Sequence, residues 1–412
     1  MRHVIGFFAP LVLLCSIHCV SLAQSTLLDN ATVIEFEAPV NDVVYDPTLD
    51  VLYASIPSIA GFPFGNSIAT IDPATGSVVD SVFVGSEPNT LAISDDGSHV
   101  FVGLDGARSV RSYQPATGAL SPIVSLSLFS IPSVAQDIAV LPNQPSVAVI
   151  SSDSVGTSAS GALRLFDGST VVSLSNDFAA NEIDFIGPTT LAALNTNTTG
   201  FQVAIAELNG TSLNTMFNAG QAVSDFDISF EAGSDGLFYF SEGTVSNPAS
   251  PLDSLGTFRT GFSATRQLVE PVPDLELVYF VGPSGGNLVL TAFNTNNFSR
   301  IDSTVLPIAA TTAEDGGELI VAGQDRLAFV FKEDEFDGAG GSGTLNIITG
   351  VPAAPTPVLL GDCNQDGAVD FLDISPLIST LSNGDFRAEA DINEDGVVDF
   401  LDVGPFIELL SL

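Results

Sequence analysis

Short apolar runs dominate the chain from Asn30 to about Val351, and hardly any of them repeats at the spacing of a helix. Apolar and polar residues alternate over a few positions at a time, with Val, Ile, Phe and Thr frequent, and Gly, Pro, Asn or Asp separates one run from the next. Such alternation places one face of a strand in a core, and the turn residues mark where strands end. The pattern therefore predicts an antiparallel, mainly β region.

One sequence phrase occurs twice in this region. Two short strands and a Pro-Ala-Thr-Gly turn occupy residues 41–76 and recur at 89–118, about 48 residues further on. Fainter copies begin near Gln136, Asn181 and Asp225, and units starting near Asp274 and Ala313 fill the remaining length. Units of about 40–50 residues with four short strands are typical of β-propeller blades. We therefore expect seven blades, with six or eight as alternatives, and a strand at 32–37 that closes the ring by pairing with the last blade.

The turn phrase, the valine-rich strand after it and the Ile-Ser-Asp-Asp-Gly segment at 93–97 resemble the YVTN-type propellers of bacterial surface-layer and secreted proteins. The resemblance is clear over residues 31–135 and rests on spacing alone beyond them. Its members include interaction scaffolds and some lactonase-like enzymes, so the resemblance implies a fold and leaves the function open.

A duplicated acidic loop near the C-terminus has the spacing of a calcium site. In both copies, oxygen side chains stand at positions 1, 3, 5, 9 and 12, glycine stands at position 6, and position 7 offers a backbone carbonyl. Calcium takes about six to eight oxygen ligands, and this spacing turns alternate residues toward one point. The sequence predicts two calcium ions, with a vacant pair of acidic loops as the alternative. The predicted ligands are Asp362, Asn364, Asp366, Ala368, Asp370 and Asp373 in the first loop and Asp391, Asn393, Asp395, Val397, Asp399 and Asp402 in the second.

Each acidic loop is followed by a predicted helix, the unit occurs twice, and no helix precedes the first loop. This arrangement resembles the type I dockerin domains of large secreted bacterial proteins, and the resemblance covers residues 361–412. It implies a small α-helical, calcium-binding domain and a cohesin-like partner. Phe-Leu pairs at 371–372 and 400–401 stand where cellulosomal dockerins commonly carry small hydroxyl residues that face cohesin. We expect the helices to begin at Ser375 and Gly404. We also expect a small core, with a partner-facing platform as the alternative, formed by Phe371, Leu372, Phe400, Leu401, Leu377, Ile378, Leu381, Phe406, Ile407 and Leu410.

Charge and composition exclude several kinds of partner. Acids outnumber bases 49 to 10, and the formal charge is −39. Nucleic acid is excluded because its binding needs a basic surface, and an anionic membrane surface would repel the chain. Apolar residues make up 45% of the sequence, so the chain is not a disordered acidic tail. The acids concentrated at 361–412 predict folding that depends on the metal.

The first residues have the pattern of a secretory signal. Arg2 and His3 precede an apolar run from Val4 to Val20, and the small residues at 21–23 suit a signal peptidase. We expect a signal peptide at 1–23, with an uncleaved anchor helix as the alternative, and hence a secreted or cell-surface protein with no membrane insertion after cleavage. The expected domains are a propeller at 24–351, a proline-rich linker at 352–360 and the calcium-loop module at 361–412. The single thiol left after cleavage, Cys363, allows no internal disulfide.

The sequence assigns no catalytic site. Residues 282–286 match a nucleophile-elbow pattern, but their surroundings predict a hairpin turn, and the one histidine left after signal cleavage, His99, precedes them. One histidine and one thiol are also too few for a zinc site. Several carboxylates near predicted inner strands are candidates for lining the axial channel, with ordinary turn residues at solvated blade edges as the alternative: Asp42, Asp137, Glu182, Asp184, Asp225 and Asp227.

Two functions of different classes follow. The first is a secreted propeller that binds a protein or glycan at the cell surface and is attached to a larger assembly by its C-terminal module. The second is an extracellular hydrolase of polysaccharides or lactones with the same tether. The sequence contains no tryptophan and five tyrosines, which disfavours a carbohydrate site built on aromatic platforms. Converging acids at the channel would favour the hydrolase.

Overall fold

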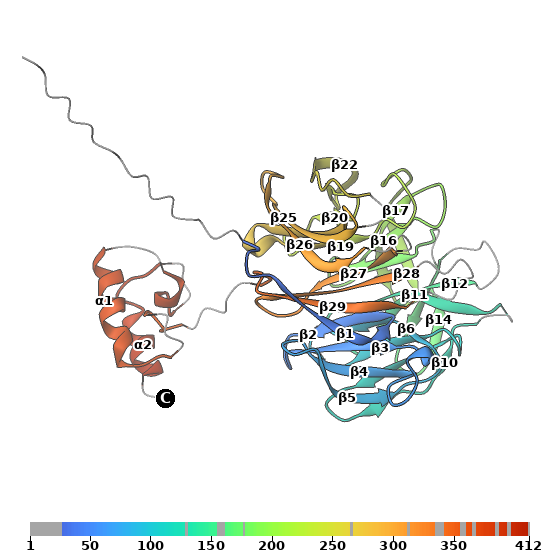
Figure 1. Cartoon of the computed structure of the whole chain (residues 1–412), viewed down its shortest axis with the longest axis horizontal. Helices are drawn as coiled ribbons and strands as arrows, with labels where there is room; N and C mark the ends of the chain where they lie inside the picture. The colour runs from blue at the N-terminus through green and yellow to red at the C-terminus, as the bar shows by residue number, and fades with distance from the viewer. Residues whose placement is uncertain are drawn as a thin grey trace, which may run out of the picture.

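The protein is described by a computed structural model over residues 27–127, 131–154, 161–175, 178–263, 267–310, 314–333, 342–354, 360–364, 368–383, 387–393 and 397–410. Within these ranges the chain forms seven antiparallel sheets arranged as the blades of a β-propeller, followed by two short α-helices (Figure 1). This confirms the predicted mainly β fold with seven blades and a small helical C-terminal domain.

The first four blades take their strands in chain order, and the first strand of each faces its counterparts around the axis. Blade 1 contains β2 (Asp42–Asp46), β3 (Val51–Ile56), η1 (Ser58–Ala60), β4 (Ser67–Asp72) and β5 (Ser77–Phe83). Blade 2 contains β6 (Pro88–Ile93), β7 (Val100–Leu104), β8 (Ser109–Gln114), β9 (Ala119–Leu120) and β10 (Val124–Ser125). Blade 3 contains β11 (Ser133–Val140), β12 (Ala148–Ser154), β13 (Ala162–Phe166) and β14 (Val171–Ser173). Blade 4 contains β15 (Glu182–Phe185), β16 (Thr190–Asn195), β17 (Gln202–Asn209) and β18 (Ser212–Ala219).

The last three blades complete the ring. Blade 5 contains β19 (Phe230–Ala232), β20 (Phe238–Phe240), β21 (Thr244–Asn247) and β22 (Ser250–Thr257). Blade 6 contains β23 (Leu268–Val272), η3 (Pro273–Leu275), β24 (Leu277–Ser284), β25 (Asn287–Asn294) and β26 (Arg300–Ala309). Blade 7 contains β27 (Glu314–Val321), β28 (Arg326–Glu333), β29 (Gly343–Thr349) and the N-terminal β1 (Thr32–Val40).

The ring closes through a strand from the opposite end of the chain. β1 pairs antiparallel with β29, with Thr32 opposite Thr349 and Ile34 opposite Ile347, and the register shifts between Glu35 and Pro39. The predicted closing strand is therefore confirmed. An apolar cluster fills the interface between blades 7 and 1, where the inward side chains of one sheet pack on those of the next. It includes Val43, Leu52, Ala54, Ile71, Val330, Leu345 and Ile347.

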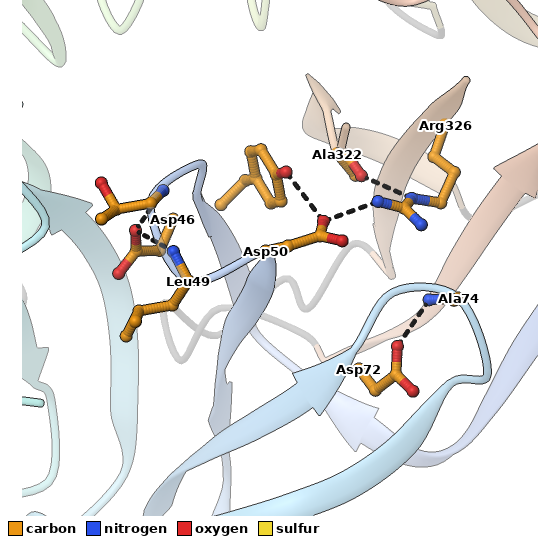
Figure 2. Close-up of polar contacts among 9 residues, drawn as sticks. Asp46, Leu49, Asp50, Asp72, Ala74, Ala322 and Arg326 are labelled. Atoms are coloured by element: carbon orange, nitrogen blue, oxygen red, sulfur yellow. Dashed lines mark hydrogen bonds and ion pairs between the residues drawn. The ribbon is translucent and has the colours of Figure 1, made fainter. Parts of the chain in front are cut away.

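The repeated turn phrase is explained by local hydrogen bonds. The Asp72 carboxylate accepts the N–H of Ala74 at 2.8 Å (Figure 2). It also accepts the Thr75 hydroxyl at 2.8 Å. These bonds fold the chain back between β4 and β5 and lower the pKa of Asp72. Gly76 ends the turn at φ +68°, a backbone conformation that glycine adopts more readily than residues with a Cβ atom.

Two blade boundaries differ from those predicted. The inner strand of blade 5 begins at Phe230 rather than near Asp225, and that of blade 6 begins at Leu268 rather than near Asp274, which lies in η3. In the expected hairpin, Ser284 ends β24 and a Gly-Gly turn leads into β25.

The C-terminal module consists of η4 (Phe371–Asp373), α1 (Ile374–Asn383), η5 (Ala388–Ala390) and α2 (Val403–Leu409). Both α-helices begin one residue earlier than predicted. No helix in the described ranges is long and apolar enough to cross a membrane. The expected signal segment, 1–23, lies outside the described residues. Before the module, Val351 and Ala353 are buried against blades 6 and 7, and the N–H of Ala353 donates to the Gln324 carbonyl at 2.7 Å.

Candidate functional site

The first acidic loop is closed by its position-12 aspartate. Oδ1 of Asp373 accepts the N–H of Asn364 at 2.9 Å, and Oδ2 accepts the N–H of Asp370 at 2.8 Å. The Asp370 carboxylate in turn accepts the N–H of Leu372 at 2.6 Å and caps η4. Positions 3, 9 and 12 of the predicted site are thereby held at one end of the loop.

The second loop repeats this arrangement. Oδ1 of Asp402 accepts the N–H of Ile392 at 2.8 Å and of Asn393 at 3.1 Å, and Oδ2 accepts the N–H of Asp399 at 2.8 Å. Asp399 accepts the N–H of Leu401 at 2.7 Å, just as Asp370 accepts the N–H of Leu372 one repeat earlier. The two predicted loops therefore have the same geometry around their last ligand.

Four carboxylates at positions 1 and 12 are almost completely buried. Asp373 and Asp402 are 0% exposed, Asp362 is 6% exposed and Asp391 is 7% exposed. Burying charged carboxylates is costly unless a partner or a metal compensates them, and Arg387 is the only base in 361–412. An all-oxygen donor set of this kind fits calcium.

Two predicted ligands, Asp366 and Asp395 at position 5, lie outside the described residues. Among the residues that are described, no three His, Cys, Asp or Glu side chains are gathered closely enough to form a metal site as they stand.

A second acidic cluster lies on the propeller axis. A cavity of about 320 Å³ is lined by the inner strands of several blades, and Lys332 of β28, the only lysine of the chain, also lines it. The carboxylates that line this cavity come from β2, β11, β15, β19 and β27, and they are Asp42, Asp137, Glu182, Asp184, Glu231 and Glu318. Together with Glu270 of β23, we call these residues the axial carboxylates.

The sequence identified four of these residues and missed three. Asp42, Asp137, Glu182 and Asp184 were candidates and do line the cavity. Asp225 and Asp227 are instead exposed residues of the segment before β19 and are not among the described residues that line it. The missed residues, Glu231, Glu270 and Glu318, lie on inner strands that have lost the repeat phrase. An acid recurring at about one blade length was the signal that could have found them.

Four axial carboxylates join neighbouring blades. Asp42 accepts the N–H of Leu91 in blade 2 at 2.8 Å, and Asp137 accepts the N–H of Ile183 in blade 4 at 2.7 Å. Glu182 accepts the N–H of Phe230 at 3.2 Å, and Glu270 accepts the N–H of Val321 at 3.3 Å. Each bond spans one blade repeat, so these side chains hold adjacent inner strands together as well as lining the axis.

Burial raises the pKa of four axial carboxylates well above the ordinary range of carboxyl groups. It raises the pKa of Asp184 to about 6, that of Asp137 to about 7, and those of Glu182 and Glu270 to about 8. Nearby carboxylates add to this effect at Asp137, Asp184 and Glu182, while the positive charge of Lys332 opposes it at Glu182. A carboxyl group that stays protonated near neutral pH is suited to general acid chemistry.

A larger cavity of about 900 Å³ shares Glu231 and Glu318 with the first one. Its rim includes Arg326 of β28, whose Nη2 lies 2.6 Å from Oδ1 of Asp50 in blade 1 (Figure 2). Ala354, which lies in the expected linker 352–360, also lines it. The chain therefore leaves the propeller beside this cavity.

Comparison with known protein families decides the nature of the C-terminal module, because residues 360–408 match the family described as the dockerin type I domain. Residues 360–408 are a dockerin type I domain. A comparison with curated proteins found no match.

Three solved structures support the propeller fold alone, since each is less than 25% identical to the chain. The β-propeller domain of Cps50 (Swd1) from Myceliophteria thermophila is 11% identical with a TM-score of 0.54, over 77% of this chain and 99% of that one. The WD40 repeats of RRP9 are 11% identical with a TM-score of 0.51, over 77% of this chain and 97% of that one. The Dos1 propeller is 16% identical with a TM-score of 0.50, over 77% of this chain and 80% of that one.

The core of the dockerin domain is smaller than the sequence suggested. It contains Cys363, Leu377, Ala390, Ile392 and Phe406, with Leu381 and Leu410 packed against it. Cys363 is 2% exposed, and burial raises the pKa of its thiol to about 11. The thiol is therefore poorly placed for thiol–disulfide exchange, which requires an accessible thiolate.

Six residues expected in this core are exposed instead, and they form two equivalent sets. Phe371 and Phe400 are 75% and 82% exposed, Leu372 and Leu401 are both 66% exposed, and Ile378 and Ile407 are 57% and 60% exposed. Corresponding members are one 29-residue repeat apart. The prediction of a core role was wrong for these residues, because the inner faces of the two helices are already filled. We call the two sets the Phe-Leu-Ile surfaces.

Proposed function

We propose that this protein is a secreted, calcium-binding propeller that acts as a binding module at the cell surface, and that its dockerin domain attaches it to a larger assembly through a cohesin-like partner. The observation that carries this proposal is the pair of Phe-Leu-Ile surfaces. Groups of exposed apolar side chains are typical of protein interaction sites, and these recur in both repeats of a domain whose family includes assembly modules.

Calcium is the metal that the proposal requires. The first ion would be held by Asp362, Asn364, Asp366, Asp370, Asp373 and the carbonyl of Ala368, and the second by Asp391, Asn393, Asp395, Asp399, Asp402 and the carbonyl of Val397. Bound calcium would neutralise the clustered carboxylates, and its binding energy would stabilise a domain too small to fold securely on its apolar core alone.

The test is binding of the full chain to a panel of immobilised cohesin domains, measured by surface plasmon resonance with calcium and with a chelator. We expect calcium-dependent binding that is lost in the double variant Phe371→Ser/Phe400→Ser. The matched control is Leu255→Ser, which removes an exposed apolar residue, 53% exposed, from the propeller strand β22. Equal binding with chelator, or no binding to any cohesin, would contradict the proposal.

A second candidate is an extracellular hydrolase of polysaccharides or lactones, with the axial carboxylates as its acid and base. The observation that favours it is the set of weakly acidic side chains around one cavity. The test is hydrolysis of a panel of lactones and polysaccharides by the wild-type chain and by Glu182→Gln. Turnover lost in this variant would support the hydrolase, and no turnover by the wild type would exclude it for those substrates.

A further inference from the structure

The interface between blades 7 and 1 joins the two ends of the propeller, and three contacts close it. On the outside, β1, the outermost strand of blade 7, packs against β3 of blade 1. At the rim of the larger cavity, Arg326 pairs with Asp50 at 2.6 Å. On the axis, the carboxyl groups of Asp42 and Glu318 are hydrogen-bonded to each other.

A hydrogen bond between two carboxyl groups requires a proton on one of them, because ionised carboxylates are acceptors only. Asp42 already accepts the N–H of Val43 at 3.0 Å and that of Leu91 at 2.8 Å. Both oxygens of Asp42 therefore already act as acceptors. This geometry places the proton on Glu318, which donates to Asp42.

The surroundings of this pair are negative. Glu231 of blade 5 and Glu270 of blade 6 line the larger cavity together with Glu318. Lys332 of β28 is the one cationic side chain that lines the smaller cavity among the described residues. β6 carries no titratable side chain. The remaining acids across the cavity are Asp137, Glu182 and Asp184. Ionisation of Glu318 would thus add a negative charge next to Asp42, among several others.

We propose that Asp42 and Glu318 form a proton-dependent contact that fastens the last blade to the first and is weakened when Glu318 loses its proton. Burial raises the pKa of Glu318 well above its ordinary value, the charge of Asp42 raises it further, and Lys332 opposes both effects. Because the folded-state pKa is raised, the contribution of Glu318 to stability is complete below its unfolded pKa of about 4.3 and declines as pH rises through the folded pKa.

The experiment follows thermal unfolding of the propeller in the full chain by circular dichroism, between pH 5 and pH 8, with calcium in excess so that the dockerin domain stays loaded. We expect the wild-type melting temperature to fall as pH rises. Glu318→Gln keeps an amide donor without a charge, so its melting temperature at pH 8 should exceed that of the wild type by roughly 2–4 °C, and its fall with pH should be smaller. The control Asp253→Asn removes an exposed charge from β22 and should follow the wild-type profile.

A second readout separates the shared proton from a general charge effect. The infrared band of a protonated carboxyl group at pH 6 should lose intensity in Glu318→Gln and not in Asp253→Asn. In addition, Asp42→Asn combined with Glu318→Gln should change the pH profile no more than one of the single substitutions does. A Glu318→Gln profile parallel to the wild type, or an unchanged infrared band, would overturn the proposal.

Discussion

Nη2 of Arg326 in blade 7 lies 2.6 Å from Oδ1 of Asp50 in blade 1, and the Tyr45 hydroxyl donates to the same oxygen at 2.9 Å. This pair is the polar contact between the first and last blades at the rim of the larger cavity (Figure 2). Asp50 is 56% exposed and Arg326 is 15% exposed, so water screens much of the attraction.

We expect Arg326→Met to lower the free energy of unfolding by less than about 1 kcal/mol at low salt, because exposed ion pairs contribute little. The loss should shrink further in high salt, where the Debye length is short. Urea unfolding at two salt concentrations measures both. Arg300→Met removes an exposed arginine from β26 and serves as the control, and a loss that is independent of salt would contradict an electrostatic origin.

The repeated turn offers a matched pair of glycines. Gly76 and Gly118 have φ values of +68° and +71°, and a Cβ at Gly76 would meet Cγ2 of Ile34 at 2.7 Å, while nothing lies within 4 Å of a Cβ at Gly118. Both alanine variants should lose about 1 kcal/mol for the left-handed conformation. Gly76→Ala should lose about 1 kcal/mol more because it displaces the closing strand β1. Equal losses in chemical denaturation would show that this contact carries no strain.

The calcium loops should lose their ions one at a time. Asp373→Ala removes the last ligand of the first loop and two hydrogen bonds that close it. Asp402→Ala removes the last ligand of the second loop and three such bonds. Isothermal titration of the full chain should show two sites in the wild type and one in each variant. Glu408→Gln, an exposed acid of α2, should keep both. Two sites in Asp373→Ala would contradict the ligand assignment.

Adjacent residues of α1 should respond in opposite ways to truncation. Leu377 is 3% exposed and Ile378 is 57% exposed. Leu377→Ala should cost about 2–5 kcal/mol in the calcium-loaded dockerin domain, because it opens a cavity in a small core. Ile378→Ala should change stability by less than about 0.5 kcal/mol, as surface substitutions usually do. Hydrogen exchange of the helix amides provides the measurement, and comparable losses would contradict the observed core.

Sequence periodicity was sufficient to predict the propeller fold and some of the carboxylates that line its axis. The phrase that opens blades 1, 3 and 4 starts at the inner strands, and it led to Asp42, Asp137 and Glu182. In blades 5 to 7 the phrase is faint or lost, so Glu231, Glu270 and Glu318 were missed, and only the recurrence of an acid at about one blade length pointed to them. Their role depends on which residues face the axis, and the fold determines that.

The dockerin domain shows a different limit of prediction. The spacing of oxygen side chains was enough to locate both loops, because calcium coordination imposes it. The Phe-Leu pairs could not be assigned in the same way, since apolar residues next to a small core suit either the interior or a partner. The structure excludes the interior for these pairs, because Leu377, Leu381 and Phe406 already occupy it.

The closing strand also fixes the order in which the molecule can be completed. The Thr32 and Thr349 hydroxyls lie 2.7 Å apart across 317 residues of chain. At ordinary rates of translation the ribosome needs roughly 15–60 s to make that length, and during this time the earliest-made strand has no permanent partner. The ring is therefore finished only once nearly the whole propeller exists. A chain that stops before β29 leaves β1 without its pairing edge, and an unpaired strand edge of this kind recruits other chains.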